Sequence, residues 1–409
     1  MKLPTLDNFD LAHKRVLLRL DINSPMDPVS NIILDDMRLR SHIPTLHDLE
    51  DSKVIIIAHQ SRPGKKDFTP LEPHAKKLRE IIKRQVKYVN DTYGDGAKTA
   101  IEKLKDGEVL VLENIRFCSD EVSKDVISQT PEEQGKIDLV RKLSSYTDFY
   151  VNDAFAVSHR SQPSIVGFPQ VMPSCFGRLM EKEITVLTGV MESKEKPRVF
   201  CLGGIKADDS FKVIKHVLER GIADKILTSG VVANIFLAAS GKEIGSQNSK
   251  FLKELGLDNF IPEAKGLMDK YEGKIEMPLD LAFQNNGSRV ETTVEKIPDN
   301  RILDIGIETI IQYKSIIEDA KIIVANGPAG VFEMKEFSLG TEEMLNSIAS
   351  SNGISVIGGG HLATLANSIS ASKGITHIST GGGACVSFLS GEKLPGIEAI
   401  RGVSRRGKK

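Results

Sequence analysis

The sequence predicts an α/β protein with two doubly wound parallel-sheet (Rossmann-like) domains joined by a hinge helix. Short, nearly continuous apolar runs alternate with segments of helical period in both halves of the chain. The 409 residues exceed what one ordinary core holds. Only 7 of the 34 glycines fall in residues 1–177, so the loops of the two halves differ in chemistry.

The stretch 178–197 separates these halves. Leu179, Ile184 and Leu187 recur near the helical period, and Pro197 marks a stop. A linker helix of this kind suits a hinge. We therefore expect a first domain over 1–177, a hinge helix over 178–197, a second domain over 198–383, and a segment over 384–409 that packs back on the first domain.

The composition limits the classes of partner. The 40% of hydrophobic residues is enough for packed cores. The formal net charge is −1, so no overall electrostatic field attracts nucleic acid or a membrane surface, and any anion site must be local. The 4 cysteines form no Cys-x-x-Cys pair, and no spacing predicts a tightly held metal. No apolar run approaches the ~20 residues of a membrane helix. We expect a cytoplasmic protein, monomeric or homodimeric, that binds small molecules.

The first half repeats strand and helix. Its predicted strands are β-branched and apolar, as in parallel sheets buried on both faces: Val16–Leu20, Val54–Ala58, Val109–Leu112 and Phe149–Val151. In such sheets ligands bind beyond the carboxyl ends of the strands. Basic side chains occur there after each strand, namely Arg38, His59, Arg62, Arg116, His159 and Arg160.

This arrangement indicates a site for a small, multiply charged anion. The planar fork of arginine binds phosphate and carboxylate oxygens two at a time. Asp21 and Asn23, directly after the first strand, suit a substrate hydroxyl. Arg19 lies inside the strand pattern and is interpreted as structural. Any one of these arginines alone would also fit a surface ion pair, so the prediction depends on their convergence.

The second half places glycines after its strands. The predicted strands are Val199–Leu202, Ile226–Thr228, Ile322–Ala325, Ile354–Ile357 and Ile375–Ile378. Glycine lets backbone N–H groups approach phosphate oxygens, and a following helix adds the positive end of its dipole. Lys206 would reach phosphates, and Glu333 would accept from a ribose hydroxyl. The pattern indicates a nucleotide, although neither a P-loop nor a G-x-G-x-x-G opening is present.

Taken in order, these motifs resemble the phosphoglycerate kinase family nearly end to end. The resemblance rests on a series of short motifs: Arg19-x-Asp21-x-Asn23-x-Pro25, His59-x-x-Arg62-Pro63, Glu113-Asn114-x-Arg116-Phe117, His159-Arg160, Gly203-Gly204-x-Lys206, Asn326-Gly327-Pro328-x-Gly330-Val331-Phe332-Glu333, Gly358-Gly359-Gly360 and Ser379-Thr380-Gly381-Gly382-Gly383. It implies reversible phosphoryl transfer from 1,3-bisphosphoglycerate to ADP, giving 3-phosphoglycerate and ATP, with Mg²⁺ accompanying the nucleotide. Domain closure would precede transfer.

The resemblance also assigns residues. It implies glycerate binding by Asp21, Ile22, Asn23, Arg38, His59, Gln60, Ser61, Arg62, Arg116 and Arg160. It implies nucleotide binding by Lys206, Gly230, Asn326, Pro328, Glu333, Gly358, Gly359, Gly360 and His361. The transferring phosphoryl group would be stabilised by Arg38 and the amides of Gly360 and Gly383.

Two positions depart from the family's common pattern. Ser210 stands where most members have a second lysine, and His361 stands where most have aspartate. Both changes resemble the archaeal branch. Two other functions also fit parts of the sequence, namely a two-lobed anion-binding protein that closes on its ligand and a nucleotide-dependent acid ligase. The binding protein accounts for the arginines and the hinge but not for two separate anion chemistries.

Overall fold

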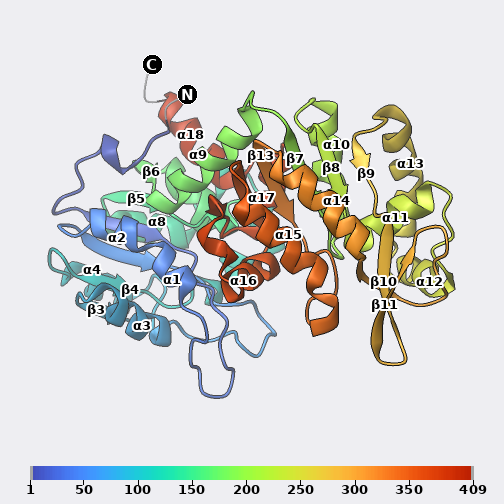
Figure 1. Ribbon diagram of the computed structural model, residues 1–409. Helices are drawn as coiled ribbons and strands as arrows, with labels where there is room; N and C mark the ends of the chain where they lie inside the picture. The colour runs from blue at the N-terminus through green and yellow to red at the C-terminus, as the bar shows by residue number, and fades with distance from the viewer. Residues whose placement is uncertain (1–2, 407–409) are drawn as a thin grey trace. The chain divides into compact units, whose positions relative to one another are not determined.

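The computed structural model describes residues 3–406, which form two compact units (Figure 1). The first comprises the described parts of Met1–Thr185 and Lys393–Lys409, and the second is Val186–Glu392. The division falls inside helix α9, which runs over Arg178–Glu192. Leu179, Ile184 and Leu187 are all buried, as their helical spacing predicts.

The first unit is built on a six-stranded parallel sheet of order β3-β4-β2-β1-β5-β6. Its strands are β1 Arg15–Arg19, β2 Lys53–Ile57, β3 Val86–Tyr88, β4 Val109–Val111, β5 Phe149–Asn152 and β6 Ser174–Phe176. Val16, Leu17 and Leu18 are all fully buried, so both faces of the sheet are covered. The two strands that the sequence did not predict, β3 and β6, are three residues long and carry no continuous apolar run.

Helices connect these strands. They are α1 Met37–Ser41, α2 Ile43–Asp48, α3 Glu72–Ile82, α4 Asp95–Glu102, α5 Ser119–Val122, α6 Lys124–Ile127, α7 Pro131–Gln134 and α8 Asp138–Tyr146. The last helix of the chain, α18 Pro395–Arg406, also belongs to this unit. Its Ala399 joins a buried cluster with Ala154, Val157, Ile165 and Val166, and the Gly396 amide donates to Ser158 O at 2.9 Å. The C-terminal helix therefore contributes to the core of the first unit.

The second unit holds another six-stranded parallel sheet, of order β15-β14-β13-β7-β8-β9. Its strands are β7 Arg198–Leu202, β8 Lys225–Thr228, β9 Ile275–Glu276, β13 Ile322–Asn326, β14 Ile354–Gly358 and β15 His377–Ile378. Its helices are α10 Ala207–Glu219, α11 Gly230–Ala239, α12 Ser246–Glu254, α13 Ile261–Lys270, α14 Ile307–Glu318, α15 Leu339–Ser350, α16 Gly360–Ser368 and α17 Gly382–Leu389. None of the helices in residues 3–406 is both long and apolar enough to cross a membrane.

A three-stranded antiparallel sheet, of order β11-β10-β12, adds to the second unit and was not predicted. It comprises β10 Asp280–Asn285, β11 Ser288–Thr293 and β12 Ile302–Ile305. The turn between β10 and β11 is Asn286-Gly287, with φ of 47° and 82°. Two consecutive positive φ values match the right-handed twist of a hairpin, and Asn-Gly favours them. This dipeptide was the available sequence signal for the extra sheet.

A buried histidine ties α3 to the loop after β2. His74 is fully buried, and its Nε2 donates to Gln60 Oε1 at 3.0 Å. Burial lowers the pKa of His74 from 6.5 to about 4. Between these pH values the unfolded chain binds a proton that the folded chain does not. The stability that depends on neutral His74 is therefore present above pH 6.5 and is lost as the pH falls towards 4.

We expect this histidine to steepen acid unfolding. The free energy of unfolding should fall by roughly 3 kcal/mol between pH 6.5 and pH 4 on account of His74 alone. The variant His74→Gln cannot titrate in this range, so its unfolding free energy should depend less on pH by that amount. Urea titrations of both proteins at several pH values measure the difference. Parallel pH profiles would contradict the assignment.

Candidate active site

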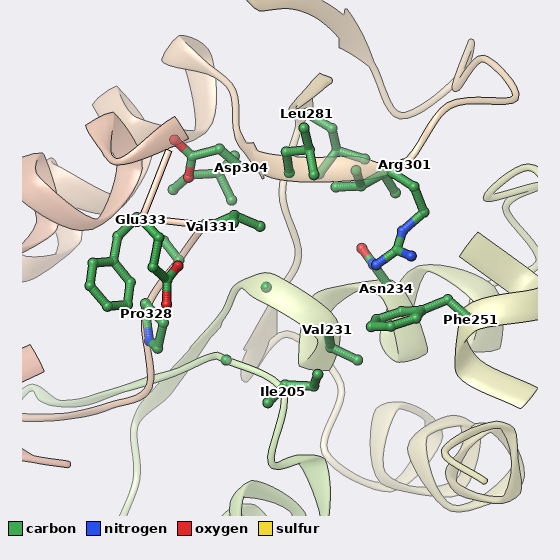
Figure 2. A pocket seen from close by; sticks show the side chains of 18 of the residues that line it. Ile205, Val231, Asn234, Phe251, Leu281, Arg301, Asp304, Pro328, Val331 and Glu333 are labelled. Carbon is green, nitrogen blue, oxygen red and sulfur yellow. The ribbon is translucent and has the colours of Figure 1, made fainter. Parts of the chain in front are cut away.

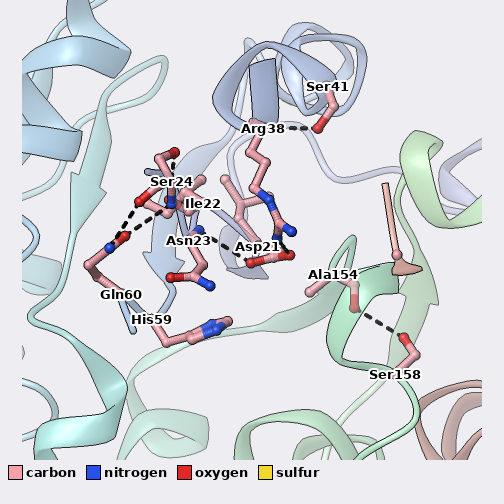
Figure 3. Close-up of polar contacts among 12 residues, drawn as sticks. Asp21, Ile22, Asn23, Ser24, Arg38, Ser41, His59, Gln60, Ala154 and Ser158 are labelled. Carbon is pink, nitrogen blue, oxygen red and sulfur yellow. Dashed lines mark hydrogen bonds and ion pairs between the residues drawn. The ribbon is translucent and has the colours of Figure 1, made fainter. Parts of the chain in front are cut away.

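The loops after β1 and β2 are joined by side-chain hydrogen bonds (Figure 3). The Ser24 amide donates to Gln60 Oε1 at 3.0 Å, and Gln60 Nε2 donates back to Ser24 O at 3.0 Å. Asn23 Oδ1 accepts from the Ser61 amide at 2.8 Å. Gln60 is buried and its side-chain groups are engaged within the protein, so it positions the loop. Asn23 remains partly exposed.

Arg38, on the short helix α1, is oriented by the loop after β1. Its Nη1 forms an ion pair with Asp21 Oδ2, drawn as a dashed line in Figure 3. The Asp21 side chain is 5% exposed, whereas that of Arg38 is 36% exposed. A buried carboxylate therefore fixes one side of the guanidinium and leaves the rest accessible. This arrangement preorganises a donor for an anion.

Arg116 is buried without full hydrogen bonding. It lies on the 3₁₀ helix η2 (Ile115–Phe117) and is 6% exposed. Its Nη1 donates to Ser61 O, but its Nη2 has no partner among the residues that the structure describes. Burial, with the charges of Arg160 and Arg19, lowers the pKa of Arg116 to about 10. A bound anion would supply the missing acceptor and offset this crowding of positive charge.

His59 lies among the arginines. Burial lowers the pKa of His59 well below its usual value, and the charges of Arg19, Arg116, Arg160 and Arg38 lower it further. These side chains, which follow different strands, are thus brought together at one end of the sheet. Arg19 is fully buried, and its Nη2 lies 3.3 Å from His59 Nδ1.

This contact sets the tautomer of His59. A guanidinium only donates, so His59 Nδ1 must accept and the ring proton must sit on Nε2. We expect nitrogen NMR to show a neutral His59 ring protonated at Nε2 at pH 6.5, where an unperturbed histidine is half protonated. His42 is the internal control, because its Nδ1 lies 2.8 Å from the Asp153 carboxylate and must carry a proton. A proton on His59 Nδ1, or a protonated ring at pH 6.5, would disprove the assignment.

The other predicted glycerate residues differ in accessibility. Arg62 and Arg160 are exposed, and Arg160 Nε donates to His159 Nε2 at 3.3 Å. Ser61 is partly exposed, and its Oγ donates to Asp67 Oδ1 at 2.7 Å. Ile22 has its side chain in the hydrophobic core, so only its backbone could meet a ligand. The structure thus presents a cluster of cationic side chains, together with buried polar residues such as Asp21 and Gln60 that hold the arginines and loops in position.

The second unit contains a cavity of about 240 Å³ beyond the carboxyl ends of its strands (Figure 2). Four of the predicted nucleotide residues line it, namely Gly230, Pro328, Glu333 and His361. The remaining walls are formed by Gly204, Ile205, Val231, Asn234, Phe251, Leu281, Arg301, Ile302, Leu303, Asp304, Ile305, Ala329, Gly330, Val331 and Phe332. The other predicted residues, Lys206, Asn326, Gly358, Gly359, Gly360 and Gly383, lie outside this wall.

Glycines form one side of the cavity because backbone meets backbone there. An added Cβ at Gly327 would lie 2.1 Å from Gly203 O, and one at Gly230 would lie 2.7 Å from the Gly204 nitrogen. The amides of Gly204 and Gly230 donate to the carbonyls of Pro328 and Ala329 at 2.8 and 3.0 Å. These N–H groups are therefore used within the protein, contrary to the expectation that glycine there frees them for phosphate.

Two helices begin at the glycine triplets. Helix α16 starts at Gly360 and helix α17 at Gly382, so the first-turn amides of both helices lack intrahelical acceptors. Helix dipoles make such ends favourable for anions. Asn326, at the end of β13, places its Oδ1 beside Gly358 and Gly359. Lys206 is exposed immediately before α10. Ser210, where the family pattern has lysine, is buried.

The sequence did not reveal the cavity wall contributed by the second turn of α11, by α12 and by the antiparallel sheet. Phe251 lies on α12, Asn234 on α11, and Leu281 on β10. Asp304, on β12, is buried, and burial raises its pKa to about 6 although Arg289 lies at 2.8 Å. None of these residues follows a parallel strand, which was the rule used to predict site residues. The Asn-Gly hairpin alone could have pointed to this wall.

The family model for phosphoglycerate kinase matches residues 6–392. The chain belongs to the phosphoglycerate kinase family. The family is a phosphotransferase family with a carboxyl group as acceptor, so the predicted family, fold class and enzyme class are confirmed. The kinase interpretation is supported over the binding protein and the ligase.

Individual relatives and solved structures with high similarity to the chain are also phosphoglycerate kinases. The chain is 52% identical to the phosphoglycerate kinase of Methanothermus fervidus, with 100% of this chain and 99% of that protein covered. It is 50% identical to that of Methanothermobacter thermautotrophicus, with 98% and 97% covered. The crystal structure of phosphoglycerate kinase from Pyrococcus horikoshii OT3 matches with a TM-score of 0.89 and 42% identity, covering 99% of this chain and 100% of that one. The structure from Coxiella burnetii matches with a TM-score of 0.80 and 27% identity, with the same coverage.

Proposed function

We propose that the two anion sites divide the reaction between them. The first unit binds 3-phosphoglycerate or 1,3-bisphosphoglycerate, and the second binds ADP or ATP with Mg²⁺. The observation that carries this proposal is the buried Arg116, whose Nη2 lacks an acceptor among the described residues and whose charge is crowded by Arg160 and Arg19. A small polyanion satisfies both conditions, whereas a neutral ligand could supply an acceptor but would not offset the crowded positive charge.

In the first unit the chemistry of each group suggests its role. Arg116, Arg160 and Arg62 would neutralise the phosphate and carboxylate oxygens of the glycerate. His59 would donate from Nε2, since Arg19 occupies its Nδ1. Asp21 and Asn23 would bind the hydroxyl group, with the Ile22 backbone between them. Gln60 and Ser61 would hold the loops in register, because both already bond to the β1 loop.

In the second unit the cavity would take the nucleoside. Glu333, exposed at its edge, would accept from ribose hydroxyls. Gly230 and Pro328 would shape the wall. The phosphates would then extend towards Lys206, Asn326, His361 and the α16 start at Gly358-Gly359-Gly360. A lysine and a helix start both suit a chain of phosphates.

Phosphoryl transfer needs positioning and charge neutralisation rather than a nucleophilic side chain. Arg38 would donate to the transferring phosphoryl group, because Asp21 orients it while leaving it accessible. The amides of Gly360 and Gly383, in the first turns of α16 and α17, would donate to the same group. The proposal requires the enzyme to close before transfer, which also excludes water that would hydrolyse the acyl phosphate.

Magnesium enters this proposal with the nucleotide. Residues 3–406 contain no group of three or more His, Cys, Asp or Glu side chains arranged to hold a metal ion. Mg²⁺ commonly keeps several waters and binds through substrate phosphates with one or two carboxylates, and the phosphate path proposed here suits that mode. When bound, the ion would neutralise phosphate charge. We place the reaction in the cytoplasm.

The test is an assay for ADP formation from 3-phosphoglycerate and Mg-ATP, with a dehydrogenase that consumes the acyl phosphate. Activity that requires 3-phosphoglycerate and yields an acyl phosphate is expected. Release of inorganic phosphate with an acceptor joined to the acid would support the ligase. Binding of both ligands without turnover would support the anion-binding protein.

A further inference from the structure

One end of the nucleotide cavity carries two unpaired polar groups. Asn234 is 4% exposed, and its Oδ1 has no hydrogen-bond partner within residues 3–406. The Nε of Arg301 is likewise buried and unpaired within that range. Both residues line the cavity. An acceptor and a donor left unpaired in a mainly apolar wall are costly, so they call for a ligand that satisfies them.

Arg301 is held in a fixed position. Its Cζ lies 3.6 Å from the ring centroid of Phe251, which places the guanidinium against the aromatic face. Figure 2 shows Arg301, Asn234 and Phe251 at one end of the view and Glu333 and Pro328 at the other. The stacked guanidinium can present its N–H edge to a flat ligand without losing its contact with Phe251.

The other polar side chains of the cavity have different surroundings. Asp304 accepts at Oδ2 from Arg289 and from the Gly340 amide. Its Oδ1 is also buried without a partner within residues 3–406, but it lies close against Gly330 and Gly340. Glu333 and His361 are exposed. Asn234 and Arg301 are thus the pair that offers a buried acceptor beside a buried donor. If Glu333 binds the ribose, the base must lie at the Asn234 end.

We propose that Asn234 and Arg301 select the base of the nucleotide by reading the edge of a 6-aminopurine. This inference rests on the proposed nucleotide site and specifies its base. Asn234 Oδ1 accepts from the exocyclic 6-amino group, and Arg301 donates to the adjacent ring nitrogen, N1. Adenine presents this donor and this acceptor side by side. Phe251 supports the guanidinium and covers the end of the cavity.

Calorimetry with Mg-ADP and two analogues tests the pair. One analogue replaces the 6-amino group with hydrogen, and the other replaces N1 with CH. For the wild-type protein we expect each analogue to bind at least fivefold more weakly than ADP. In Asn234→Leu the penalty for losing the 6-amino group should disappear while the N1 penalty remains. In Arg301→Met the reverse is expected.

Leu281→Ala is the matched control, because Leu281 lines the same cavity without a polar group. It should weaken all three ligands and leave both penalties unchanged. A cooperative thermal unfolding transition of the second unit, as in the wild type, shows that each variant is folded. Penalties that persist in both variants, or that are absent from the wild type, would overturn the inference. If the wild type binds no Mg-ADP, the proposed nucleotide site itself is wrong.

Discussion

Arg38→Ala is expected to lower kcat at least a hundredfold, roughly 3 kcal/mol of lost transition-state stabilisation. Nucleotide affinity should stay nearly unchanged, because Arg38 belongs to the first unit and the proposed nucleotide site to the second. The physical reason is preorganisation. The ion pair with Asp21 orients the guanidinium in advance, so binding phosphoryl oxygens costs little reorganisation.

Two companion variants separate catalysis from structure. Arg40→Ala removes an arginine from the same helix, whose Nε bonds only the partly exposed Asp36 at 2.8 Å, and should leave kcat within twofold. Arg38→Lys keeps a charge for Asp21 but loses the planar fork, so it should recover stability more than turnover. Steady-state kinetics with both substrates and calorimetry with Mg-ADP give the comparison. A kcat within fivefold of wild type in Arg38→Ala would remove Arg38 from catalysis.

The parts of the fold that the sequence revealed share one property. Strands such as β1 and β2 are buried on both faces, so the residues must be apolar without interruption, and that is visible in a linear chain. The short edge strands β3 and β6 carry no such run. The antiparallel strand β11 has only exposed and half-buried residues, and only its Asn-Gly turn marked it.

The cluster of cationic side chains in the first unit was predictable for a topological reason. Parallel strands end at one edge, so the residues after them meet there whatever their separation in the chain. This rule does not predict how deeply each side chain is buried. It could not tell that Arg116 is buried while Arg62 is exposed, or that Gln60 bonds the neighbouring loop. Arg19 was interpreted as structural, and its burial supports this, but its contact with His59 Nδ1 could be seen only in three dimensions.

The cavity in the second unit was predicted less completely because half of its wall follows no parallel strand. Gly230, Pro328 and Glu333 stand in loops that the topology brings together. Asn234 and Arg301 lie in a helix and beside an antiparallel strand, where a single polar residue resembles any other surface residue. Their unpaired buried atoms are what distinguishes them, and pairing depends on neighbours distant in the sequence.

Asp153→Ala is expected to destabilise the protein by roughly 3 to 5 kcal/mol, because it leaves several buried donors without an acceptor. Asp153 is fully buried. Its Oδ2 accepts from His42 Nδ1 and Thr45 Oγ1, both at 2.8 Å. Its Oδ1 accepts from the amides of Leu179 and Met180 at 2.9 and 3.2 Å. One carboxylate thus caps the start of α9 and anchors α2.

The same carboxylate links the loop after β1 to α9. His42 Nε2 lies 3.2 Å from the backbone nitrogen of Asp21 and 3.1 Å from its carbonyl oxygen. His42 can therefore accept from the Asp21 amide without a proton on Nε2, or donate to the Asp21 carbonyl with one. Asp153→Asn should be nearly as destabilising as the alanine variant. The asparagine NH₂ group would replace one carboxylate oxygen and face groups that donate, so those hydrogen bonds would be lost. Asp148→Ala is the control. That exposed carboxylate accepts from the Arg15 amide, and its loss should cost less than about 1 kcal/mol.

Gly177 supplies an independent check on this network. An added Cβ there would lie 2.3 Å from Asp153 Oδ1, so Gly177→Ala must displace the carboxylate or the start of α9. If Asp153 is the residue that fixes this helix start, the two substitutions share one cost. Gly177→Ala should therefore destabilise the Asp153→Ala protein much less than the wild type, as a double-mutant cycle from urea unfolding would measure. Additive costs would mean that Gly177 and Asp153 support α9 separately, and that the link from the loop after β1 to this helix runs through other groups.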